Sequence, residues 1–240
     1  MIVAIDGPAG SGKSTTARCV ADALGWLYLD TGAMYRAAAL AFKDADVPFG
    51  VAGAERVLPG LSLDLHRDGD ALRVFLNGDE VTDRIRSTQA SEAASRVSTI
   101  PSVRARLVDV QRRIAREQIA AGGGVVMEGR DIGTVVFPDA GLKVFMVAEV
   151  AERAQRRHRD LEARGETATL DAVAADIEAR DARDAARDIA PLKQALDAVV
   201  LDTTGLTIDD QVAFVIALVR ERADDSVVET DRPLATKPTS

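Results

Sequence analysis

A segment near the start of the chain combines glycines, a lysine and a hydroxyl residue at a spacing that suits anion chemistry. It reads Gly7-Pro8-Ala9-Gly10-Ser11-Gly12-Lys13-Ser14, followed by Thr15, and it fits the pattern G-x-x-x-x-G-K-[ST] between an apolar stretch and a helical one. Glycines let backbone N–H groups turn inward around a phosphate, and the amino end of the next helix adds positive charge. In this geometry Lys13 reaches the β- and γ-phosphates of a nucleotide and the Ser14 hydroxyl ligates Mg²⁺. The segment predicts an ATP site; a glycine turn that binds nothing is the weaker alternative.

Two further groups of polar residues follow short apolar stretches, where the carboxyl ends of parallel strands would line a ligand crevice. The first runs from Asp30 through Thr31 to Arg36, whose guanidinium, about a turn and a half into the next helix, could reach back and bind a phosphate in bidentate fashion. A surface ion pair is the alternative for a lone arginine. The second is Glu128-Gly129-Arg130-Asp131-Ile132-Gly133-Thr134. Here Arg130 is placed to bind an acceptor phosphate, while Asp131 would accept a hydrogen bond from an exocyclic amine, orient Arg130 or help with the metal.

A cluster of arginines and aspartates lies later in the chain, from Arg180 to Arg187. Arg180, Arg183, Asp184 and Arg187 follow an i, i+3, i+4, i+7 spacing, which predicts that they share one helix face. Such a face suits a polyphosphate, and a solvated ion-pair helix is the alternative. With a phosphate loop for the donor, arginines for the acceptor and an arginine-bearing mobile lid, the sequence holds the parts that phosphoryl transfer needs.

Composition narrows the partners and the compartment. The 240 residues carry a formal net charge of −8, which disfavours binding to nucleic-acid polymers because their backbone requires a basic surface. A single cysteine, Cys19, allows no intramolecular disulfide and indicates a reducing compartment. No apolar run approaches the length of a membrane span, and no signal peptide is evident. We therefore expect a cytoplasmic protein that binds no membrane.

Short apolar stretches alternate with helical ones, which predicts an α/β fold with a parallel sheet buried on both faces. The expected strands are residues 2–5, 27–29, 125–127, 142–147 and 198–201, and the expected helices include 14–24, capped by Gly25, and one opening near Thr207.

Two segments interrupt the alternation. Apolar and polar residues alternate over 61–65 and 72–76, with turn residues at Asp68-Gly69 and Asn77-Gly78, which predicts a small antiparallel β meander. Residues 152–191 predict a lid of two charged helices joined around Gly165. We expect one domain over residues 1–222, with an inserted monophosphate-binding region over about 36–105, and a disordered tail over 223–240.

These motifs resemble those of the bacterial cytidylate kinases over roughly residues 1–220. The phosphate loop is shared with many families, but the meander and the run from Gly129 to Thr134 that continues as Val135-Val136-Phe137-Pro138-Asp139-Ala140 are more particular. The resemblance implies ATP-dependent, Mg²⁺-dependent phosphorylation of CMP and dCMP by a parallel-sheet core, an inserted monophosphate-binding subdomain and a short helical lid. It also implies that cytosine is read by Ser95, with Ser98 as the alternative, together with Arg104 and Asp131.

The same resemblance assigns the acceptor phosphate to Arg36 and Arg130, and ribose contacts and charge stabilisation to Arg180, Asp184 and Arg187. Lys13, Arg130, Arg180 and Arg187 would thus be the catalytic residues. A kinase of another acceptor, such as UMP, AMP or shikimate, is the main alternative. A switch GTPase would need an Asn-Lys-x-Asp motif, which the sequence lacks, and a non-catalytic nucleotide sensor is the remaining reading. Because lid and insert must move, we expect a monomer.

Overall fold

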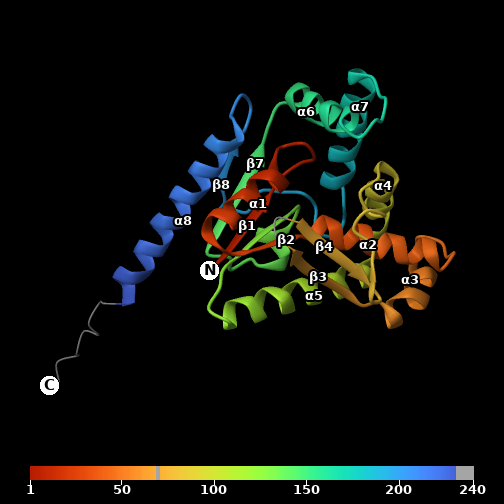
Figure 1. The fold of residues 1–240 in the computed structure, drawn as a ribbon, viewed down its shortest axis with the longest axis horizontal. Coiled ribbons are helices and arrows are strands. Elements are labelled where there is room, and N and C mark those ends of the chain that lie inside the picture. The colour runs from red at the N-terminus through yellow and green to blue at the C-terminus, as the bar shows by residue number, and fades with distance from the viewer. Residues whose placement is uncertain (69–70, 231–240) are drawn as a thin grey trace.

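Five short apolar segments pair as a parallel sheet at the centre of the computed structural model, which describes residues 1–68 and 71–230 (Figure 1). The strands lie in the order β2-β6-β1-β7-β8, and every neighbouring pair is parallel. The predicted α/β fold is therefore confirmed. The strand bounds are Ile2–Asp6 (β1), Leu27–Asp30 (β2), Val125–Gly129 (β6), Leu142–Val147 (β7) and Val199–Asp202 (β8).

Helices cover both faces of this sheet, because successive strand side chains point to opposite sides. In β1, Val3 and Ile5 belong to the apolar cluster formed with α1 (Lys13–Leu24) and α8 (Ile208–Thr230). Ala4, between them, belongs to the cluster formed with α2 (Thr31–Asp44) and α5 (Pro101–Ala120). Gly25 caps α1 in the left-handed conformation, as predicted.

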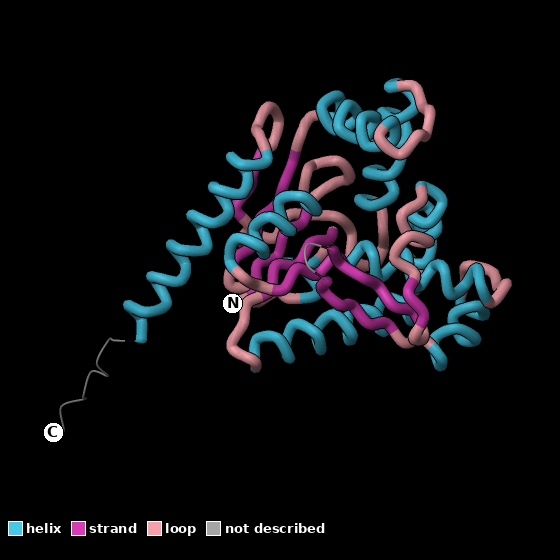
Figure 2. The backbone as a smooth tube through the Cα atoms, viewed as in Figure 1, coloured by secondary structure: helices cyan, strands magenta, loops and turns pink. Residues whose placement is uncertain are grey.

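The predicted meander is present as a separate three-stranded antiparallel sheet (Figure 2). Its strands are β3 (Leu63–Asp68), β4 (Ala71–Leu76) and β5 (Asp79–Glu80). Asn77 and Gly78 make the second turn at φ values of 54° and 92°, the positive values that an Asn-Gly hairpin turn requires. Gly69, of the other predicted turn, lies outside the described residues. Around the meander lie α3 (Val51–Val57), the short 3₁₀ helix η1 (Leu58–Gly60) and α4 (Thr88–Val97).

The lid consists of α6 (Val150–Glu162) and α7 (Leu170–Ala185), joined by a segment in which Gly165 has a φ of 74°. One expectation was wrong: Arg187 is not on the helix face of Arg180, because α7 ends two residues earlier. A further helical turn would need the Asp184 carbonyl as a hydrogen-bond acceptor, but the Leu192 N–H already binds it. The chain therefore folds back across the end of α7. Arg183 is exposed but lies beside Arg180 on α7, as expected, and both line the same pocket.

The carboxyl-terminal helix extends further than its polar sequence indicated. We expected order to end at residue 222, whereas α8 continues to Thr230. Residues 223–230 contain no glycine or proline, so their polarity does not break a helix whose earlier turns are anchored on the sheet. The rest of the expected tail, 231–240, lies outside the described residues.

Candidate active site

The candidate site lies at the carboxyl edge of the parallel sheet. The strand register aligns Asp6 with Gly129 and Asp30 with Glu128, so three strands end side by side with polar residues. The lid helices α6 and α7 and helix α4 stand beyond this edge (Figure 1). This edge is where open parallel sheets bind ligands.

The phosphate loop leaves β1 and turns into α1 through three glycines with positive φ values. Gly7, Gly10 and Gly12 have φ values of 152°, 77° and 91°. A methyl group on Gly7 would lie 2.2 Å from the Met146 carbonyl oxygen, so only glycine fits there. Lys13 Nζ donates a hydrogen bond of 2.7 Å to the Pro8 carbonyl, across the loop itself. The loop thus has the shape that cradles a phosphate.

Glu128 was not among the predicted site residues, yet it lies at the centre of this edge. It is buried and accepts a hydrogen bond of 2.8 Å from Ser14 Oγ and one of 2.6 Å from the Tyr28 hydroxyl. Burial and the neighbouring Asp30 raise its pKa, against the opposing effect of Lys13. The signal available in the sequence was its place at the end of an apolar strand, where an acidic residue meets the loop hydroxyl.

Four cationic side chains converge behind the loop. Burial, Arg130 and Arg180 lower the pKa of Lys13 to about 7. The pKa of Arg180 is lowered to about 10 by burial and by the charges of Arg130 and Arg36, although Asp184 opposes the shift. The Nε atoms of Arg36 and Arg180 are buried and have no hydrogen-bond partner among the described residues. Such crowding of like charges is relieved by an anion.

Carboxylates hold these arginines apart. Arg36 Nη2 lies 2.9 Å from Asp30 Oδ2, and the other oxygen of Asp30 caps α2 through the Ala33 N–H. Arg130 Nε lies 3.0 Å from Asp184 Oδ2, and the second oxygen of Asp184 binds Arg187. Arg187 therefore reaches the site even though it lies beyond α7.

Asp184 is buried, which raises its pKa, but three arginines outweigh that effect and hold the pKa below its usual range. Thr31, also expected to contact substrate, is buried and donates its hydroxyl to the Glu128 carbonyl at 2.7 Å. Thr15 is exposed on the first turn of α1.

A second buried ion pair lies beside the first group. Arg104, from α5, binds Asp131, and both side chains are almost completely buried. Burial raises the pKa of Asp131, while Arg104 opposes the shift. Of the roles considered for Asp131, orienting Arg130 does not apply here, because Arg130 pairs with Asp184 instead. Ser95 lies in α4 and borders the pocket, whereas the Ser98 hydroxyl is occupied by the Ser95 carbonyl at 2.8 Å.

Asp6 is another residue that the sequence did not single out. Its two carboxylate oxygens accept the Ile132 and Gly133 N–H groups at 2.9 Å and 2.8 Å. These donors open a single π-helical turn, η2 (Ile132–Val136), directly after Arg130 and Asp131. Burial raises the pKa of Asp6 to about 6, against the two N–H donors. Asp6 thereby fixes the turn that aims the two site residues.

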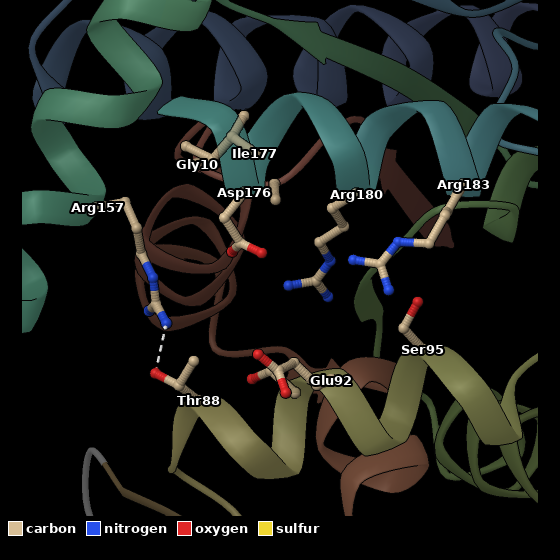
Figure 3. A pocket seen from close by; sticks show the side chains of 11 residues that line it. Gly10, Thr88, Glu92, Ser95, Arg157, Asp176, Ile177, Arg180 and Arg183 are labelled. Atoms are coloured by element: carbon tan, nitrogen blue, oxygen red, sulfur yellow. Dashed lines mark hydrogen bonds between the residues drawn. The ribbon is translucent and has the colours of Figure 1, made fainter. Parts of the chain in front are cut away.

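A pocket opens between the lid, α4 and the tip of the phosphate loop, with about 480 Å³ of empty space when its solvent-open part is counted. Side chains of α7 face those of α4 across it (Figure 3). Ala9 and Gly10 of the loop form one wall. The other residues that line it are Thr88, Ser91, Glu92, Ser95, Arg157, Asp176, Ile177, Arg180 and Arg183.

Metal and membrane features are limited in the part of the chain that the structure describes. No group of three or more His, Cys, Asp or Glu side chains there is arranged to hold a metal ion. None of the helices described within 1–68 and 71–230 has the length and apolar character needed to cross a bilayer.

Fold and site together define a phosphate-loop kinase, with a glycine-rich loop and a group of buried arginines at the carboxyl edge of the sheet. Comparison with known proteins gives the particular family. The profile of the cytidylate kinase family matches residues 3–221. A "Cytidylate kinase" of Salinibacter ruber is 56% identical over 220 residues, covering 92% of this chain and 97% of that protein. A "Cytidylate kinase" of a Geobacter species is 45% identical over 223 residues, covering 92% of this chain and 94% of that protein.

The chain belongs to the cytidylate kinase family, and it is an ATP-dependent nucleoside monophosphate kinase that phosphorylates CMP and dCMP. The family generally uses ATP with Mg²⁺. Among solved structures, an uncharacterized protein from Eubacterium ventriosum has a TM-score of 0.51 at 12% identity, covering 92% of this chain and 98% of that one. That likeness concerns the fold alone.

Proposed function

We propose that the convergent cations Lys13, Arg36, Arg130 and Arg180 form the catalytic centre for the phosphorylation of CMP and dCMP. The observation that carries the proposal is the convergence of buried cations. The Nε atoms of Arg36 and Arg180 are buried with no hydrogen-bond partner among the described residues. Burial, Arg130 and Arg180 all lower the pKa of Lys13. In the free protein these charges repel one another. A transferring phosphoryl group, whose charge spreads over its oxygens, would relieve that repulsion.

The roles follow from where each cation is anchored. The loop and Lys13 hold the donor phosphates. Arg36 and Arg130, each fixed by one carboxylate, bind the acceptor phosphate. Arg180 and Arg187 stabilise the charge of the transferring group, and Asp184, between Arg130 and Arg187, contacts the ribose. Because the lid carries three of these groups, its position decides when the centre is complete.

Base recognition falls to the second buried ion pair and to Ser95. The Asp131 carboxylate accepts a hydrogen bond from the exocyclic amine of cytosine, and Arg104 and Ser95 bind its ring carbonyl and nitrogen. An acceptor without that amine would leave one hydrogen bond to the buried carboxylate unmade, which costs about 1–3 kcal/mol or more. This argument favours CMP and dCMP over UMP, the nearest alternative acceptor, whose base carries a carbonyl oxygen in place of the amine.

The donor set beside the loop fits Mg²⁺. Ser14 and the buried Glu128 carboxylate present oxygen atoms within hydrogen-bond distance of each other, and magnesium prefers one or two protein oxygens with water and phosphate. Ser14, with Glu128 next to it, would hold the ion. When bound, the metal neutralises charge on the β- and γ-phosphates. We further propose that the protein works in the cytoplasm as a monomer. Light scattering of the purified chain would measure its oligomeric state.

The first experiment measures ADP release with ATP and Mg²⁺ while CMP, dCMP, UMP, AMP and GMP are offered separately. Turnover that depends on CMP or dCMP supports the proposal, and turnover with AMP or GMP instead would overturn the roles of Ser95, Arg104 and Asp131. Arg130→Ala should lower kcat/KM for CMP at least about tenfold, roughly 1.4 kcal/mol. Arg84→Ala, which removes an exposed arginine paired with Asp44, is the control and should leave the value unchanged. Equal values for the two variants would remove Arg130 from the site.

A further inference from the structure

Polar contacts join the lid to the amino end of α4. The Thr88 hydroxyl donates to Glu166 Oε2 at 3.1 Å. It also accepts from Arg157 Nη2 at 3.4 Å, the contact drawn in Figure 3. Arg164 Nη1 donates to the Arg86 carbonyl at 3.1 Å. Arg157 comes from α6, while Arg164 and Glu166 lie in the segment between α6 and α7. One hydroxyl of α4 therefore contacts two parts of the lid.

Thr88 is not needed to begin its own helix. Ser87 is the N-cap residue of α4 and accepts the Ala90 N–H at 3.1 Å. At the first helical position threonine has no propensity advantage, since its helix propensity is close to that of valine. The Thr88 hydroxyl, which is bonded to the lid, calls for a role outside α4.

The lid is also tied to the core, through Arg153 to the Ala9 carbonyl, Arg156 to Thr203 and Asp184 to Arg130, but none of these contacts reaches α4. The lid's apolar cluster (Ala154, Leu161, Val173 and Ile177) is separate from the two clusters of the core. Arg157, Arg180 and Arg183 line the same pocket, and Glu92 and Asp176 offset only part of their charge, so the excess positive charge opposes closure until an anion arrives. Contacts at the rim of the pocket offset part of this repulsion.

We infer that Thr88 is a positioning residue of the kinase reaction: its hydroxyl docks the lid on α4 through Glu166 and holds Arg157 beside the phosphate-loop tip. Because α4 also carries Ser95, this contact ties lid closure to the helix that takes part in acceptor recognition. Closure excludes water, which otherwise competes with the acceptor for the phosphoryl group. The inference rests on the proposed function.

The test compares Thr88→Val, which removes the hydroxyl at nearly constant shape, with Thr88→Ser, which keeps it. Thr99→Val is the matched control, because that exposed hydroxyl at the other end of α4 binds only the Arg96 carbonyl of its own helix. Because Thr88→Val lacks the hydroxyl contacts, it should lower kcat/KM for CMP about three- to tenfold, the effect expected from losing one or two hydrogen bonds. Hydrolysis of ATP without CMP should rise relative to coupled transfer, and Thr88→Ser should restore both values to within about twofold.

Glu166→Ala removes the same hydrogen bond from its other partner, which lies in the segment between α6 and α7. Thr88→Val and Glu166→Ala should each reduce kcat/KM, and the double variant should be no worse than the poorer single one. If Thr88→Val matches Thr99→Val in both readouts, if serine fails to rescue, or if the two losses add in full, Thr88 has no positioning role. If the unmodified protein itself fails to phosphorylate CMP, the proposed function falls instead, so the two failures are distinguishable.

Discussion

At the scale of single residues, the site is built from charges that oppose one another. Lys13 is almost completely buried, and its ammonium group faces Arg130 and Arg180 with only Glu128 and Asp6 to compensate. Its pKa of about 7, against 10.5 for an ordinary lysine, means that the folded chain binds this proton more weakly than the unfolded chain. The resulting cost to stability is complete below pH 7 and fades as the pH rises from 7 to 10.5. Bound phosphate should reverse this shift.

Binding of a non-hydrolysable ATP analogue should therefore take up a proton at Lys13. At pH 8 the lysine is mostly neutral in the free protein, and we expect uptake of about one proton; at pH 6 it is already charged, and uptake at this residue should vanish. Calorimetry in buffers of different ionisation enthalpy measures the number of protons taken up on binding. Lys13→Arg, which stays charged, is the control and should show no such difference between the two pH values. Equal uptake by both proteins would contradict the assignment.

Some of these residues were predictable and some were not, for a physical reason. The loop is one contiguous motif, so Lys13 and Ser14 followed from spacing. Ion pairs between distant residues, such as Arg130 with Asp184, depend on where the lid returns to the sheet. Glu128 escaped notice because its role appears only when β6 is aligned beside β1, which brings its carboxylate to the loop hydroxyl.

At the scale of elements, Asp6 connects the donor and acceptor sides of the site. It ends β1, immediately before the loop, and its carboxylate binds the first two N–H groups of η2, which follows Asp131. The folded protein binds a proton at Asp6 more tightly than the unfolded chain, because burial raises the pKa from 3.8 to about 6. A stability contribution is thus present in full below about pH 4 and is lost as the pH rises through 6.

Asp6→Asn should remove this pH dependence. We expect the difference in unfolding free energy between unmodified protein and variant to fall by about 2–3 kcal/mol from pH 4 to pH 7, the equivalent of the raised pKa. Urea unfolding at several pH values measures it. Asp83→Asn, at a side chain that is 94% exposed, should give a flat difference. A flat difference for Asp6→Asn as well would show that Asp6 is not held as described.

The elements themselves followed from sequence where the pattern was local. All five parallel strands were predicted to within two residues at each end, because each is a short, mostly apolar run. The π-helical turn η2 was not predicted, because its first N–H groups are held by Asp6, far away in the sequence. The end of α7 was also missed, since a backbone bond from Leu192 sets it and not the helix's own residues.

At the scale of the whole molecule, the apolar residues form three clusters of unequal size. Two lie on opposite faces of the parallel sheet and join most helices to it. The third, between α6 and α7, has four buried members, which is a small core for a unit that must stay folded while it moves. Local opening free energies follow buried contacts, so the lid should open far more often than the sheet unfolds.

The same substitution in two clusters tests this separation. Val173 in the lid is 5% exposed and Val215 under the sheet is fully buried, so alanine at either position should cost about 2 kcal/mol. For Val215→Ala we expect the loss in the global free energy of unfolding, measured in urea. For Val173→Ala the loss should appear in hydrogen exchange of α6 and α7, while the slowest amides of β1 and β7 keep their protection. Because a lid that opens alone leaves the sheet intact, equal losses of protection in the sheet for both variants would mean that the lid and core unfold as one unit.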